Sequence, residues 1–211
     1  MKRAAFVAYA SLLCVPLVAF AQQGAIVTVL QGAVTVEQET PVPRPAAVLI
    51  KLRAGDKLQL ARDATVQLVY FDNGRQETWR GAARLEVGAG ESTASGGTPE
   101  PEVKQLPQML VRQLVKTPTA DSSGRVGAVR LRHIIAPDAE EKLEKNYAEL
   151  RAQTEAADRT PELYLLAGLF ELKRYERIEA LLGDWEKEAP AEASVAAMQQ
   201  HYRVAIREAR K

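Results

Sequence analysis

The sequence predicts an α+β protein, in which a small antiparallel all-β sandwich or barrel is followed by a linker and a C-terminal bundle of about four antiparallel helices. Short β-branched runs, separated by glycine and aspartate turns, fill residues 24–90. The next segment, residues 91–136, opens with a polar stretch rich in glycine, serine and threonine. Residues 137–211 repeat apolar side chains every three or four positions, which is the period of an amphipathic helix.

An export signal is predicted over residues 1–21, ahead of the folded part. Lys2 and Arg3 form a short positive region, and an uncharged apolar run follows over residues 4–20. The Ala-Phe-Ala tripeptide that ends at Ala21 has the small residues that signal peptidase requires. We therefore expect cleavage after Ala21 and a periplasmic location for the mature chain.

Two other fates of this segment follow from its length and its cysteine. The apolar run is close to the ~20 residues that span a bilayer, so retention as a membrane anchor is the rival interpretation. Cys14 would be the acceptor for lipidation, but the bulky Leu13 precedes it where a small residue is required. Cys14 is also the only cysteine, so the mature chain is expected to have no disulfide and no thiolate. After signal cleavage, no membrane span is expected.

The charge balance gives no general attraction to nucleic acid or to anionic lipid. The chain has 28 Lys and Arg against 27 Asp and Glu, a formal net charge of +1. A hydrophobic fraction of 46% is ordinary for a globular protein. We therefore expect no nucleic-acid partner.

The first half is expected to consist of short strands. Each is a run of β-branched or alternating apolar residues, and the runs cover residues 25–30, 33–37, 48–52, 58–60, 65–71, 75–79 and 83–87. Asp72-Asn73-Gly74 predicts a hairpin turn, because Asn and Gly tolerate positive φ. Residues 40–45 contain three prolines and predict a loop, since proline cannot sit in a central strand.

The order of turns and strands resembles the FecR-like β domain over about residues 25–88. The resemblance is carried by the run from Leu52 to Leu58 with its Gly55-Asp56 turn, by Ala64 to Tyr70, by Asp72-Asn73-Gly74 and by Leu85-Glu86-Val87. It implies a small, non-catalytic all-β domain of periplasmic signalling and envelope proteins. The family's usual hairpin is Asp-Gly rather than Asp-Asn-Gly. Its signalling members also carry a cytoplasmic anti-sigma segment, which is not expected here, so that role is not carried over.

Residues 91–136 are expected to form a linker with a short helix and an extra strand. The stretch over residues 90–99 is typical of a linker rather than a phosphate loop, because no strand–loop–helix frame surrounds it. A helix is expected over residues 103–115, where three leucines recur at near-helical spacing.

Residues 126–133 alternate apolar and basic side chains, as a strand would. Arg130, Arg132 and His133 form a local basic cluster, which could contact an anionic partner such as a glycan phosphate or an acidic protein face. The alternative, which the alternation favours, is the solvated side of a strand.

The second half is expected to contain four helices. The first begins near Asp138, with acidic residues in its first turn. The second begins at Thr160 and Pro161, with threonine as N-cap and proline at the first helical position. Apolar spacing places the third and fourth helices around residues 175–185 and 195–205.

The second and third helices resemble a tetratricopeptide-type hairpin, within a helical module of about residues 138–210. The resemblance is carried by the small pair Ala167-Gly168, by Phe170, Tyr175 and Ile178, and by Pro190. One repeat is visible, whereas arrays of such repeats usually need about three or more. The resemblance implies contact with another protein rather than chemistry.

No catalytic residue, cofactor site or metal site is expected. The two histidines, His133 and His201, lie in different elements, and no metalloprotease, nucleophile-elbow or dinucleotide motif is present. We therefore expect a non-catalytic periplasmic protein that binds or scaffolds an envelope protein partner. The alternative is a module that binds peptidoglycan or another cell-wall glycan. Trp79 and Tyr70 are its candidate sugar contacts, but they lie on facing strands and are expected rather to pack together. An enzyme with carboxylates paired by the fold is the third hypothesis.

Overall fold

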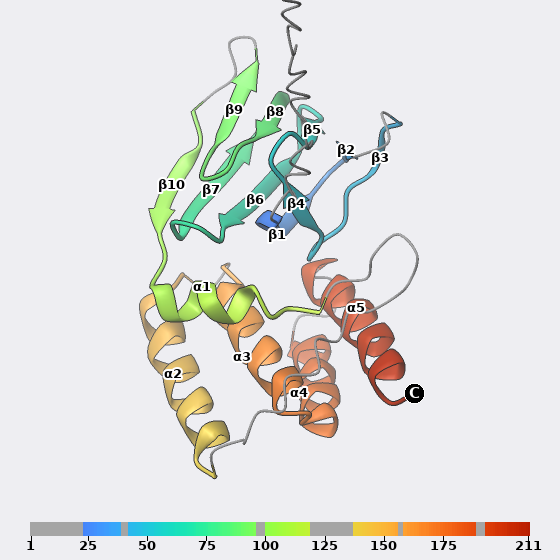
Figure 1. Cartoon of the computed structure of the whole chain (residues 1–211). Helices are drawn as coiled ribbons and strands as arrows, with labels where there is room; N and C mark the ends of the chain where they lie inside the picture. Colours follow the sequence, from blue (N-terminus) through green and yellow to red (C-terminus); the bar gives the residue numbers. More distant parts are fainter. Residues whose placement is uncertain (1–22, 39–41, 96–99, 119–136, 156–157, 189–192) are drawn as a thin grey trace, which may run out of the picture.

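The computed structural model describes residues 23–38, 42–95, 100–118, 137–155, 158–188 and 193–211. Two antiparallel five-stranded sheets form the N-terminal part, and five helices follow in the described chain. In Figure 1 the sheets occupy the upper half of the molecule and the helices the lower half. The predicted fold class, an antiparallel β-sandwich followed by a helical bundle, is confirmed.

Each sheet combines strands that lie far apart in the sequence. The first sheet has the order β10 (Glu102–Gln105), β7 (Arg75–Arg80), β6 (Thr65–Tyr70), β1 (Gln23–Gln31) and β4 (Lys51–Arg53). The second sheet has the order β3 (Arg44–Pro45), β2 (Val34–Glu37), β5 (Lys57–Leu60), β8 (Ala83–Val87) and β9 (Ser92–Ser95). All described strand pairs are antiparallel.

The inner faces of the two sheets pack together into one apolar core. Val66, Leu68 and Tyr70 of β6 belong to the same buried cluster as Leu58 of β5 and Leu85 of β8. Successive side chains of a strand point to opposite faces, so buried and exposed positions alternate along β5 and β8. Burying each of these larger side chains contributes about 1.5–3 kcal/mol, which makes this core the main support of the sandwich.

A second core joins the first sheet to the helices. Ile26 of β1 and Val69 of β6 are fully buried, and they cluster with Leu163 and Leu166 of α3 (Thr160–Glu171). The strand β6 is therefore buried on both faces from Val66 to Tyr70, and the one polar side chain among these residues, Gln67, accepts a hydrogen bond from the Thr28 hydroxyl at 2.7 Å.

The helix α3 lies at the centre of the helical half. Its neighbours are α1 (Gln108–Leu114), α2 (Ala139–Gln153) and α4 (Tyr175–Glu188), and the last helix is α5 (Ala193–Ala209). The side chains of α3 are buried from its first residue through Leu169, as expected for a helix that is apolar on two sides.

The segment predicted as a linker contributes a strand to each sheet, which corrects that expectation. Ser92–Ser95 forms β9 beside β8, and Glu102–Gln105 forms β10 beside β7. The helix expected over residues 103–115 is accordingly shorter and begins at Gln108. The physical reason is Pro107, which holds the preceding residue in an extended conformation and cannot continue a helix from it. The proline-rich loop also contains the two-residue edge strand β3.

The start of α3 differs from the prediction in its capping residue. Thr160 is the first helical residue, and Arg159 occupies the N-cap position without a capping hydrogen bond from its side chain. Asp158 takes over the capping role, because its Oδ1 accepts from the Thr160 amide at 3.0 Å and from the Thr160 hydroxyl at 2.5 Å.

Gly168 allows α2 and α3 to approach closely. A Cβ atom built at this position would lie 2.3 Å from Cδ1 and 2.6 Å from Cδ2 of Leu143. Gly168 was predicted to let two helices approach, and in the structure these helices are α2 and α3. The resemblance to a tetratricopeptide hairpin concerned α3 and α4 instead.

Candidate functional site

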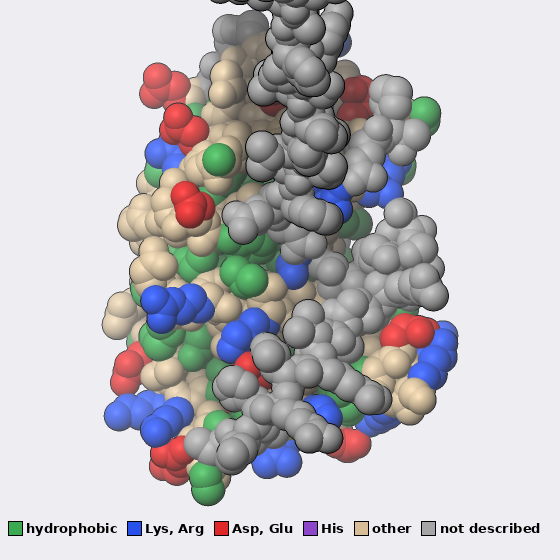
Figure 2. Space-filling view, in the orientation of Figure 1, with side chains coloured by type: hydrophobic (Ala, Val, Ile, Leu, Met, Phe, Trp, Pro, Cys, Tyr) green, Lys and Arg blue, Asp and Glu red, His purple; other side chains and the backbone are tan. Residues whose placement is uncertain are grey.

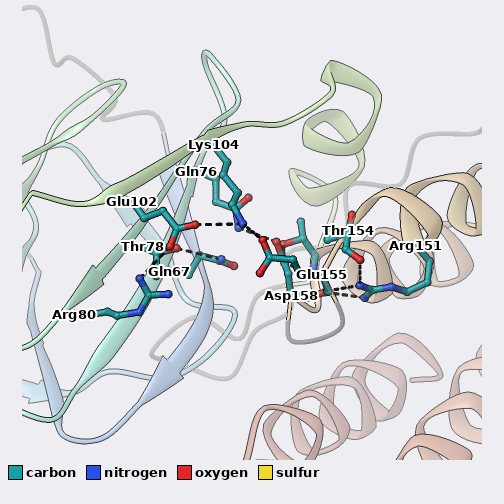
Figure 3. A network of polar contacts seen from close by, with 11 residues as sticks. Gln67, Gln76, Thr78, Arg80, Glu102, Lys104, Arg151, Thr154, Glu155 and Asp158 are labelled. Carbon is teal, nitrogen blue, oxygen red and sulfur yellow. Dashed lines mark hydrogen bonds and ion pairs between the residues drawn. The ribbon is translucent and has the colours of Figure 1, made fainter.

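Buried polar contacts fix the first sheet against the helices (Figure 3). Gln76 of β7 donates from Nε2 to Oδ2 of Asp158 at 3.2 Å, and both side chains are buried. The same aspartate caps α3, so one carboxylate joins the sheet to the start of a helix. Nearby, Nζ of Lys104 donates to Oε1 of Glu155 at 2.8 Å, in a more exposed position. The carboxylate of Asp158 is thus fully engaged in structural hydrogen bonds.

A second buried acid has a similar structural role in the helical half. Glu162 accepts from Nη1 of Arg151 at 3.1 Å, and its side chain is only 3% exposed. The guanidinium also donates to the carbonyl oxygens of Thr154 and Asp158, at 2.7 and 2.8 Å. Arg151 therefore connects the end of α2 to the start of α3 and leaves Glu162 no free oxygen directed at solvent.

The third buried acid, Glu77, holds the sandwich closed and fixes Trp79. Glu77 is 0% exposed and accepts from Nε of Arg75 at 2.7 Å and from Nε1 of Trp79 at 3.0 Å. It also accepts from the Ser92 amide in the opposite sheet, at 3.2 Å. The glycan hypothesis required an accessible aromatic ring, and Trp79 is only 4% exposed.

Tyr70, the other aromatic residue of the glycan hypothesis, is fully buried as well. Its hydroxyl lies 2.5 Å from Oγ of Ser92. Burial is the largest influence on this phenol and raises its pKa well above the usual value. Neither ring offers a face for stacking against a sugar.

The basic cluster singled out in the sequence, Arg130, Arg132 and His133, lies outside the described residues. So do the predicted signal segment and Pro190. The other histidine, His201 of α5, has its Nε2 against the carbonyl oxygen of Pro118. Burial lowers the pKa of His201, the carbonyl of Pro118 raises it, and the charge of Lys51 lowers it further.

Lys51 lies at the same junction between the first sheet and the helices. Its Nζ donates to the carbonyl oxygen of Val115 at 2.8 Å, and burial lowers its pKa to about 8. A lysine of this kind can serve as a base or a nucleophile when it faces a cleft. Here its amine is directed at the chain just after α1, so its observed contact is structural.

A polar hollow on the outer face of the second sheet is lined by charged side chains that form no ion pair within the described part of the chain. The hollow has a volume of about 450 Å³ and is lined by Thr35, Glu37, Lys57, Leu58, Gln59, Arg84, Leu85, Glu86 and Ser95. Its charged and polar side chains come from β2, β5, β8 and β9, and they alternate with the buried residues of the sandwich core.

The strand register brings opposite charges side by side across the hollow. In the strand register, Lys57 lies opposite Glu37 of β2 on one side and opposite Glu86 of β8 on the other. Arg84 lies in the next row, opposite Gln59. Among the described residues, none of the four charged side chains forms an ion pair or a side-chain hydrogen bond, so all four are free to bind a polar ligand.

Sequence reasoning did not identify this hollow. Alternation along each strand does mark Glu37, Lys57, Arg84 and Glu86 as outward positions. What the sequence lacks is the order β2-β5-β8-β9, which places those outward positions next to one another.

Within the described ranges, no group of three or more His, Cys, Asp and Glu side chains is arranged to hold a metal ion. No helix there is long and apolar enough to cross a bilayer. On the face of the helical half that Figure 2 shows, side chains of Lys and Arg are interspersed with those of Asp and Glu.

The fold and the hollow define an α+β protein with four unpaired charged side chains on the outer face of its second sheet, among the residues that the structure describes. No family model, no curated protein and no solved structure matches the chain.

Proposed function

We propose that this chain is an exported, non-catalytic interaction protein of the bacterial envelope, and that the polar hollow of the second sheet binds its protein partner. The observation that carries the proposal is the division of charge in the fold. The buried acids Glu77, Asp158 and Glu162 are all bonded to structural partners, whereas the four charges of the hollow are unpaired.

The chemistry of the hollow favours a polar protein segment as its occupant. Its lining offers two cations, two anions, the amide of Gln59 and the hydroxyl of Thr35, which complement a segment that carries charges of both signs. The residues that line it include no aromatic side chain. Sugar sites usually stack a ring on an aromatic side chain, so the lining and the burial of Trp79 both favour protein over glycan.

Export is the second part of the proposal and rests on the sequence of residues 1–21. Expression in a Gram-negative host followed by N-terminal sequencing of the periplasmic protein tests it. The proposal expects the mature chain to begin at Gln22. A chain that keeps Met1 and stays with the membrane fraction would contradict cleavage.

Charge reversal in the hollow tests the binding surface. The variant Lys57→Glu with Arg84→Glu should weaken partner binding by roughly tenfold or more, because like charges then face each other across the interface. The matched control is Lys145→Glu with Arg203→Glu, which changes the net charge equally at two exposed helical positions. Both variants, and the unchanged protein, are used as bait in a crosslinked periplasmic pull-down.

Three results of the pull-down are informative. Loss of a partner with the hollow variant, and its retention with the control, supports the proposal. Equal recovery with both variants places binding elsewhere and contradicts it. Retention of the protein on peptidoglycan, with no protein partner recovered, would contradict it in favour of the glycan alternative.

A further inference from the structure

The strand β10 leaves one edge of the first sheet open. It is the terminal strand of that sheet, and Figure 1 shows it at the outer edge of the molecule. Among the described residues it pairs with β7 alone. All four of its residues are exposed, and Val103 is 44% exposed although it is apolar. An open edge with an exposed apolar side chain is a template for pairing with another strand.

The hydrogen bonds of β10 show which of its backbone groups face outward. The Leu106 amide donates to the carbonyl oxygen of Gly74 at 2.9 Å, so this residue points its backbone groups toward β7. Backbone groups of successive residues alternate between the two edges of a strand. Glu102 and Lys104 therefore also face β7, while the N–H and C=O groups of Val103 and Gln105 face the open edge.

The side chains of β10 are self-complementary in one antiparallel register. When Val103 lies on a two-fold axis opposite Val103 of a second copy, each Glu102 stands opposite Lys104 of the other copy. The two neighbouring symmetric registers place Lys104 opposite Lys104, or Glu102 opposite Glu102, and oppose like charges. Only the register centred on Val103 combines outward-facing backbone groups at the axis with opposite charges on both sides of it.

Contacts within one copy extend this pattern. Glu102 accepts from Nη1 of Arg80 at 3.0 Å, and Lys104 forms ion pairs with Glu155 at 2.8 Å and with Glu102 of its own copy at 3.3 Å. Pairing across the axis would thus create a row with alternating charge: Arg80, Glu102, then Lys104 and Glu155 of the second copy. The neighbouring edge strand β9 has the uncharged sequence Ser-Thr-Ala-Ser, so it has no charge pattern that could select a pairing register.

We infer that two copies of this chain associate edge to edge through β10, with Val103 on the two-fold axis, to form a continuous sheet of ten strands from two five-stranded sheets. Pro101 has no amide to donate, so the paired segment is short and the dimer is weak and concentration-dependent. This dimer is independent of partner binding in the hollow, because the two surfaces share no residue.

Charge reversal on β10 tests the register directly. Glu102→Lys alone places lysine opposite lysine, and Lys104→Glu alone places glutamate opposite glutamate. Each variant should be monomeric by analytical ultracentrifugation, where the unchanged periplasmic protein approaches twice the monomer mass as its concentration rises. An equimolar mixture of the two variants should dimerise again, because lysines of one then face glutamates of the other. Restored assembly also shows that both variants fold.

A backbone variant tests the strand pairing itself. Val103→Pro removes an amide that faces the open edge and spares the bonds to β7, so it should abolish the dimer. Val103→Thr keeps that amide and should preserve the dimer. The inference is overturned if the unchanged protein stays monomeric up to its solubility limit. It is also overturned if a dimer forms that the proline variant or the single charge reversals leave intact.

Discussion

The buried carboxylate of Glu77 provides the sharpest stability prediction. Replacing it by alanine removes the acceptor of the Trp79 indole N–H and of the Ser92 amide. Leaving a buried donor unsatisfied costs about 1–3 kcal/mol, and the Trp79 side chain is almost completely buried. Arg75 is 30% exposed and can turn to water, so its loss adds little. We therefore expect Glu77→Ala to lower the free energy of unfolding by about 3 kcal/mol.

A double-mutant cycle with Trp79→Phe isolates the indole contact. Phenylalanine has no N–H to satisfy, so Glu77→Ala should cost about 1–2 kcal/mol less in that background. Urea unfolding followed by fluorescence and circular dichroism gives the four free energies, provided that the urea dependence stays the same. Glu86→Ala is the control, because this exposed acid has no described partner and should change stability by less than about 0.5 kcal/mol.

The reasoning about Glu77 fails if the alanine variant is as stable as the Glu86→Ala control. It also fails if the cost is the same with tryptophan and with phenylalanine at position 79. Either result would mean that the carboxylate does not hold the indole in the sandwich.

Other consequences concern the helical half. Gly168→Ala should destabilise the protein by about 1–2 kcal/mol, since the new methyl group overlaps Leu143 while alanine recovers up to about 1 kcal/mol of helix propensity. Adding Leu143→Val should restore part of that loss in thermal unfolding, and a Gly168→Ala protein that melts higher than the unchanged one would contradict the close approach. Burial lowers the pKa of His201 below its usual 6.5, so the unfolded chain takes up this proton first as the pH falls. The free energy of unfolding should therefore decrease as the pH falls below about 6.5. His201→Asn should flatten this pH dependence, and an unchanged pH dependence in that variant would refute the buried position of His201.

Much of the fold follows from local patterns in the sequence. The alternation in residues 83–87 gives the inner and outer faces of β8, and the double apolar face of β6 reflects its burial between the second sheet and the helices. The helical spacing likewise gives α2 to α5 within a few residues. These features were predictable because burial of one face or of two faces leaves a period in the sequence.

The strands β9 and β10 were missed because edge strands bury little. Ser-Thr-Ala-Ser and Glu-Val-Lys-Gln have no run of apolar residues, and the backbone pairing that makes them strands leaves no trace in side-chain type. The helix over residues 103–115 was predicted too long because leucine spacing outweighed Pro107.

The candidate sites show the same division between local and long-range information. Trp79 was a candidate contact because sugar sites need exposed aromatic rings beside polar groups. The structure buries it in the sandwich instead, where its N–H donates to Glu77, two residues away. The hollow depends on neighbours such as Lys57 and Glu86, which are far apart in the chain and meet only through the pairing of β5 with β8. No local period encodes that pairing.

Site-specific crosslinking from the hollow tests the central claim most directly. A photoreactive residue at Gln59, which lines the hollow, is compared in the periplasm with the same residue at Gln153, an exposed position at the end of α2. The account predicts a crosslinked protein adduct from position 59 that disappears when Lys57 and Arg84 are changed to glutamate. Adducts of equal yield from both positions, or an adduct from position 153 alone, would contradict the hollow as the partner-binding surface.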